Sequence, residues 1–163
     1  MSVPDLIDQA LAVCPDDHPL DVIQEMMIEK FPPIELEVFH HFAEGVYVRE
    51  LRVPAGALVT SRIHKHSCVS IVSKGKAHVW TEEEGDRVVS APACWHTVAG
   101  SRRIGYVLED LIWLTAHACE ETDPDKVLEV LTFEPPAPAR FQEWLEGGVP
   151  RSALPPLPKE LLE

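Results

Sequence analysis

The sequence lacks the features of several large functional classes. It has 14 Lys and Arg against 27 Asp and Glu, a formal net charge of −13, and a chain poor in basic residues binds nucleic acid weakly because phosphate contacts come mainly from Lys and Arg. No apolar run approaches the roughly 20 residues that cross a bilayer. A signal peptide has a basic segment followed by an apolar one, and residues 1–17 do not contain this combination. We therefore expect a cytoplasmic protein that binds neither nucleic acid nor membranes.

Common catalytic and cofactor motifs are also missing. The sequence contains no Gly-rich phosphate loop, no dinucleotide fingerprint and no Ser-His-Asp order. The four cysteines are far apart, with no C-x-x-C pair, at Cys14, Cys68, Cys94 and Cys119. This spacing argues against a disulfide framework or a zinc ribbon, and predicts reduced thiols in the core. These patterns leave open whether the protein is an enzyme.

What the sequence does contain predicts three segments. In residues 1–35 apolar positions recur at helical spacing and are interrupted once, which predicts two short helices ending before a Pro pair. Residues 36–119 change to short apolar stretches separated by turns. Residues 120–163 begin with a helix expected after Asp123-Pro124 and continue as a Pro-rich tail with one amphipathic piece at 140–146.

The middle segment has the pattern of antiparallel β-structure. Stretches rich in Val, Ile, Leu and aromatic residues are separated by Gly, Pro and charged residues, including a turn expected at Lys74-Gly75. We predict strands at residues 36–42, 46–53, 57–64, 66–73, 76–82, 86–90, 96–99 and 104–118. Many short strands at this spacing favour a sandwich or a small barrel, and the absence of alternating helices argues against a doubly wound α/β fold.

A pair of histidines in this segment suggests chemistry. His64 and His66 stand two residues apart on a predicted strand, and alternate side chains on a strand share a face. Two neutral imidazoles on one strand form half of a divalent-metal site. The alternative is that one or both are ordinary strand histidines. His40 and His41, being adjacent, are expected to point to opposite faces.

The order of several short motifs resembles the cupin superfamily, and most closely cupin-like proteins of unassigned function encoded in tailed-phage and prophage genomes. The motifs span residues 38–131 and lie at His40–Glu50, Pro54–Gly56, Ile63–His66, Val72–Gly75, Ala91–Pro92, Gly100–Arg103 and Glu109–His117. The resemblance implies an all-β cupin double-stranded β-helix, a jelly-roll barrel with the functional site at its mouth. Short N-terminal helices and a helical, Pro-rich C-terminal extension would be added to this barrel.

The sequence departs from the cupin pattern at two ligand positions. Metal-binding cupins usually supply a Glu shortly after the His pair, but residues 67–71 are Ser-Cys-Val-Ser-Ile. They also supply a His several residues after a Pro, and His96 lies near that place, one residue out of phase. A slip of one residue turns a strand side chain to the opposite face.

Other residues are candidates to complete the site. One face of the predicted strand 104–118 carries Glu109, Trp113 and His117. Our predicted metal ligands are His64, His66 and His117, with His96 as the alternative third ligand. The predicted ligand-binding residues are Glu50, His78, Trp80, Glu109 and Trp113. Imidazole ligands exclude none of Zn²⁺, Ni²⁺, Fe²⁺ and Mn²⁺, and a His-rich set favours Zn²⁺ or Ni²⁺.

The function predicted from these features is a phage-associated, cupin-like protein that binds a small molecule and a His-ligated divalent metal. The alternative is a metal-free cupin that sequesters a ligand, with Cys68 among the lining residues, or a structural or host-interaction protein. We expect a homodimer, because exposed sheet edges, the N-terminal helices and the tail offer surface for pairing.

Overall fold

The computed structural model describes residues 3–13, 16, 18–30 and 34–133. These residues form two compact units, the N-terminal helices up to Ile34 and a β-rich unit that begins at Glu35. The predicted Pro-rich tail, its amphipathic piece at 140–146 and Cys14 lie outside the described residues.

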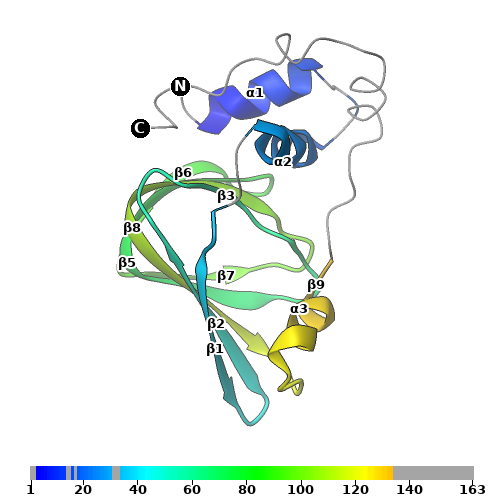
Figure 1. Cartoon of the computed structure of the whole chain (residues 1–163), viewed down its shortest axis with the longest axis vertical. Coiled ribbons are helices and arrows are strands. Elements are labelled where there is room, and N and C mark those ends of the chain that lie inside the picture. Colours follow the sequence, from blue (N-terminus) through cyan, green and yellow to red (C-terminus); the bar gives the residue numbers. More distant parts are fainter. Residues whose placement is uncertain (1–2, 14–15, 17, 31–33, 134–163) are drawn as a thin grey trace. The chain divides into compact units, whose positions relative to one another are not determined.

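The first unit contains the two predicted helices, α1 (Val3–Val13) and α2 (Pro19–Lys30), which contact each other (Figure 1). In α1 the buried residues Val3, Leu6, Ile7 and Ala10 recur every three or four positions, so they share one face. In the described part of the chain no helix has the length and apolar character needed to cross a membrane.

The second unit is built from antiparallel strands that curve around a common interior (Figure 1). The main sheet has the order β1-β2-β8-β5-β6, with β3 paired to β8 and β7 paired to β5. The strands are β1 (Glu37–Ala43), β2 (Val46–Val53), β3 (Leu58–Thr60), β4 (Ile63–His64), β5 (Cys68–Thr81), β6 (Gly85–Ser90), β7 (Ala93–Thr97), β8 (Arg103–Ala118) and β9 (Thr132–Phe133). The prediction of an all-β fold with short helices is confirmed.

The segment after β8 packs back onto this unit. Helix α3 (Pro124–Leu131) begins where predicted, with the Asp123 carboxylate accepting a hydrogen bond of 3.0 Å from the Asp125 backbone N–H. Its buried residues Val127 and Leu131 pack with Tyr47 of β2. The strand that follows, β9, pairs with β4. The last described element therefore fixes the segment that contains His64.

The predicted turn at Lys74-Gly75 is wrong, because β5 continues through both residues. Gly75 has φ +84°, and a Cβ at this position would lie 2.8 Å from the Glu109 carbonyl oxygen and closer still to the backbone of Asp110. The register between β5 and β8 shifts here, as in a β-bulge. Before the shift the buried side chains of β5 are at even-numbered positions, such as Ser70 and Val72. After it they are at odd-numbered positions, such as Ala77 and Val79.

The interior changes character along the strands. One part is filled by a cluster of buried apolar residues that includes Val53, Val79 and Val107. Further along, the inward positions become polar, and the buried residues there include His64, Ser70, Thr97, Arg103 and His117. Buried polar groups of this density need partners, which identifies this part of the interior as the candidate site.

Candidate metal centre

The strand register places the polar residues of the interior in adjacent rows. Tyr47 of β2 lies opposite His117 of β8, and Cys68 of β5 lies opposite Thr97 of β7. In the next row Thr115 is opposite both Arg49 and Ser70. Because alternate residues of a strand share a face, the two rows point to the same side of the sheet.

His64 reaches this site from the short strand β4. Its backbone N–H donates to the Ser101 carbonyl at 3.3 Å, and its own carbonyl accepts from the Gly100 N–H at 2.8 Å. On the other side β4 pairs with β9, where His64 lies opposite Thr132. The backbone of His64 is therefore held on both sides, which restricts the position of its imidazole.

Three buried side chains meet at the centre of the site. His64, Cys68 and His117 are 7 %, 4 % and 5 % exposed, and one donor atom from each lies within 4.8 Å of the other two. The Cys68 Sγ is 3.8 Å from the His64 Nδ1. The two imidazole rings are stacked, with centroids 5.8 Å apart and an interplanar angle of 19°. Thiolate and imidazole donors at this separation suit a transition metal such as zinc.

Arg103 lies directly beside this cluster. Its guanidinium donates to the Ser70 hydroxyl at 3.1 Å and to the Thr97 hydroxyl at 3.2 Å. The same Nη2 is 3.5 Å from the His64 Nε2, and the guanidinium carbon lies 5.0 Å from the centre of the Trp113 ring. These contacts fix the position of a buried positive charge next to the donor atoms.

Burial and charge determine the protonation of the cluster. Burial, together with the nearby Arg103 and Arg49 guanidinium groups, lowers the pKa of His64 to about 4, and burial with the same two arginines lowers the pKa of His117 to about 4. Both imidazoles are therefore neutral near pH 7, as metal coordination requires. Burial raises the pKa of the Cys68 thiol, against the opposing effect of Arg103. A bound metal would offset this by favouring the thiolate.

The donor set fits a transition metal. Two neutral imidazoles and one thiolate would hold the ion and leave at least one coordination position for a further ligand. Such an ion would supply Lewis acidity to whatever occupied that position. Tyr47 supports the arrangement from one side, with its ring 6.0 Å from that of His117 and its hydroxyl 2.8 Å from the His40 Nδ1.

Two predicted histidine ligands lie outside the cluster. After His64 the chain bends, so His66 does not continue the strand and is exposed, although it is near enough to His117 to affect the pKa of that residue. His96 is exposed on β7, and its neighbours Trp95 and Thr97 take the inward positions. The structure does not bring either residue within the group formed by His64, Cys68 and His117.

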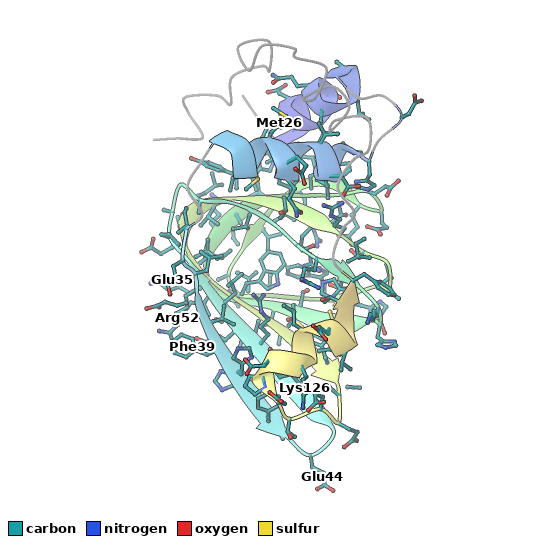
Figure 2. All side chains as sticks on the ribbon, turned by 45° about the vertical axis from the view of Figure 1, so that its right-hand side comes forward. Met26, Glu35, Phe39, Glu44, Arg52 and Lys126 are labelled. Atoms are coloured by element: carbon teal, nitrogen blue, oxygen red, sulfur yellow. The ribbon has the colours of Figure 1, made fainter. Side chains whose placement is uncertain are left out.

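The two predicted carboxylates lie at the surface. Glu50 accepts from Arg52 at 2.8 Å and is 3.0 Å from the His41 Nε2, on the face of β2 opposite Tyr47. Figure 2 shows Arg52 beside Phe39 on the outside of the strands. Glu109 is exposed at the bulge, where the β5–β8 register shifts. As predicted, His40 and His41 point to opposite faces, since one contacts Tyr47 and the other Glu50.

The remaining predicted residues are divided between the two faces of the sheet. His78 and Trp80 alternate with the buried Ala77 and Val79, so they point away from the core, and His78 is 2.6 Å from Asp86. Trp113 lies in the interior, where its ring meets that of Trp95 edge to face at 5.1 Å. Of the five predicted ligand-binding residues, Trp113 therefore lies beside the cluster and the other four do not.

Sequence reasoning did not identify Cys68 as a metal donor or Arg49 as part of the site, and for Arg102 and Arg103 it favoured a solvated turn over a position near an anionic ligand. Cys68 follows His64 by four residues, and this spacing was the available signal. No local pattern marks Arg103, because its side chain reaches the cluster from the far end of β8. The prediction of core thiols holds for Cys68 but is wrong for Cys94, which is exposed.

No protein-family model matches the chain, and no curated protein matches it. Similar solved structures include an RmlC-like cupin family protein with a double-stranded β-helix fold from Methanocaldococcus jannaschii, at 14 % identity, covering 60 % of this chain and 90 % of that chain, with a TM-score of 0.44. A cupin-2 domain containing protein from Shewanella frigidimarina has 10 % identity and a TM-score of 0.42, and the match covers 60 % of this chain and 92 % of that chain. A cupin superfamily protein from Desulfitobacterium hafniense has 8 % identity and a TM-score of 0.45, and the match covers 56 % of this chain and 84 % of that chain. Likenesses at this level assign neither a ligand nor a reaction to this chain.

Proposed function

We propose that this chain is a cupin-type barrel protein that binds a divalent transition metal through His64, Cys68 and His117 and presents it to a small molecule. The observation that carries the proposal is the convergence of three buried donors within 4.8 Å of one another. Zinc is the ion this set favours, because imidazole and thiolate are its preferred ligands in proteins. The cupin assignment and the phage association come from the resemblance of the sequence motifs.

Metal analysis of the purified full chain tests this proposal. We expect about one zinc per chain after expression with Zn²⁺ supplied. His64→Ala, His117→Ala and Cys68→Ser should each weaken binding by about 100-fold or more, because even the loss of a group that only orients a ligand costs 10–100-fold. In the Co²⁺-loaded protein, the thiolate-to-metal charge-transfer absorption should disappear in Cys68→Ser.

His66→Ala and His96→Ala are the matched controls, since both residues are exposed histidines outside the cluster. Both variants should keep the metal. If His66→Ala loses it as completely as His64→Ala, the ligand set contains His66; if Cys68→Ser at the same time keeps the metal, the assignment of Cys68 fails. Absence of stoichiometric metal after expression with Zn²⁺, Ni²⁺, Fe²⁺ or Mn²⁺ would leave the metal-free binding protein as the better function.

We further propose that the chain forms a homodimer through β1. This strand is at one end of the main sheet, where its unpaired backbone groups can accept another strand. The β1–β2 hairpin, whose tip carries Glu44 in Figure 2, exposes Phe39, Phe42 and Val46 at 40 %, 36 % and 42 %. Light scattering should give a mass near twice 18.2 kDa, and Phe39→Glu should halve it, whereas Leu108→Glu, at a comparably exposed position on β8, should not. A monomeric wild-type chain at micromolar concentration would contradict this arrangement.

A further inference from the structure

The site contains more positive charge than its own residues neutralise. Arg103 is 8 % exposed, and Arg49 is half-buried on the same face of β2 as the buried Tyr47. Arg52 and Arg87 each pair with a carboxylate, whereas in the described part of the chain neither Arg49 nor Arg103 does. Glu83 and Glu84 raise the pKa of Arg103, but their effect is smaller than that of burial, which lowers it.

Burying a guanidinium without a counter-ion is costly, so a pair of them beside one cluster calls for a negative partner. The neutral imidazoles cannot provide it. Cys68 would provide one negative charge if a metal bound, but the metal would add two positive ones. The net charge of the site is therefore positive with or without the ion.

Arg103 also has unused capacity to donate hydrogen bonds. Its two terminal nitrogens are bonded to Ser70 and Thr97, whereas its Nε is buried and has no partner among the described residues. The guanidinium is already oriented by those hydroxyls and by Trp113, so a ligand would not have to pay for ordering it. A planar fork of N–H donors matches the two oxygens of a carboxylate.

We propose that the small molecule bound at this centre is an organic carboxylate, recognised by Arg103 and Arg49 next to His64, Cys68 and His117. A singly charged carboxylate is favoured over a phosphate dianion, because the greater charge costs more to remove from water. The neighbouring Trp113 and Trp95 rings would contact the apolar part of such a ligand. This inference rests on the proposed function in taking the same centre as the binding site.

The test is a titration of the full-length ¹⁵N-labelled chain, followed at the arginine Nε–H resonances. Benzoate is the probe, benzamide is its neutral counterpart, and inorganic phosphate is the competing anion. Benzoate should shift the Arg103 Nε–H signal in a saturable way, and benzamide should not. Arg103→Gln and Arg49→Gln should each weaken benzoate binding by about tenfold or more, as the loss of a charge-assisted hydrogen bond requires.

Arg52→Gln is the matched control, because Arg52 lies on the outer face of β2 and should leave benzoate affinity unchanged. Arg103→Lys retains the charge but not the fork of N–H donors, so it should bind benzoate less tightly than wild type. This variant provides the test if Arg103→Gln proves unstable. Equal shifts with benzamide, tighter binding of phosphate, or variants with wild-type affinity would overturn the inference.

The titration is performed with the metal-free and with the Zn²⁺-loaded chain, so that the two proposals can fail separately. Benzoate binding in a chain that takes up no metal would refute the metal centre and support the carboxylate site. A chain that binds zinc but shifts with no anion would retain the metal centre and refute the carboxylate site.

Discussion

Replacing Gly75 with alanine should lower the free energy of unfolding by about 4 kcal/mol, placing it among the most damaging single substitutions. At φ +84° the new Cβ would be strained, and it would also meet the backbone of Glu109 and Asp110, which cannot move without separating β5 from β8. Urea unfolding monitored by tryptophan fluorescence would measure the loss.

Gly85→Ala separates the two causes. Gly85 also has a positive φ, +69°, but nothing lies within 4 Å of an added Cβ, so only the conformational cost of about 1–2 kcal/mol applies. A loss at Gly75 no larger than the loss at Gly85 would show that the two strands do not approach as closely as the structure has them.

Acidification should destabilise the metal-free chain between pH 7 and pH 5. His64 and His117 have pKa values of about 4 in the fold, against 6.5 for an ordinary histidine. The unfolded chain therefore binds protons that the folded chain excludes. The stability linked to this difference is complete above about pH 6.5 and is lost as the pH falls toward 4, by about 2 kcal/mol for each histidine at pH 5.

Urea unfolding in EDTA at pH 7, 6 and 5 measures this effect. His117→Gln should have a shallower dependence on pH than wild type, because one of the two groups is gone. His96→Gln, which removes an exposed imidazole from the opposite face of β7, should keep the wild-type slope. A wild-type stability that is constant or rises toward pH 5 would mean that the buried imidazoles are charged in the fold.

The periodicity of the sequence located most of the helices and strands, but not all of their breaks or faces: the predicted strand 57–64 is divided into β3 and β4, and β9 was not predicted. The long strand β8 and the helix after Asp123 follow directly from apolar spacing and from the Asp-Pro start. Gly75 was read as a turn because Gly commonly marks one, whereas here it permits a bulge within a continuous strand. The residues that follow are consequently on the opposite face from that expected, which is why His78 and Trp80 point away from the core.

The candidate site was only partly predictable for a related reason. His64 and His117 are visible in the sequence as histidines on predicted strands. His66 was paired with His64 on the assumption that the strand continues, but the chain bends between them. Arg103 joins the site through a long side chain that crosses the interior to Ser70 and Thr97. These contacts join residues that are far apart in the sequence, so a local sequence pattern does not predict them.

The pairing of β4 with β9 has a consequence for the order in which the protein assembles. All three donors have been synthesised once the ribosome reaches His117, and the sheet that holds Cys68 and His117 has its strands by then. Before residues 131–133 are made, the backbone of His64 is held on one side only, by its hydrogen bonds with Gly100 and Ser101. The second side is completed last, when β4 pairs with Thr132–Phe133 and the Lys65 N–H donates to the Leu131 carbonyl at 2.9 Å. A chain that ends before Leu131 would therefore carry all three donors but would fix the position of His64 less firmly.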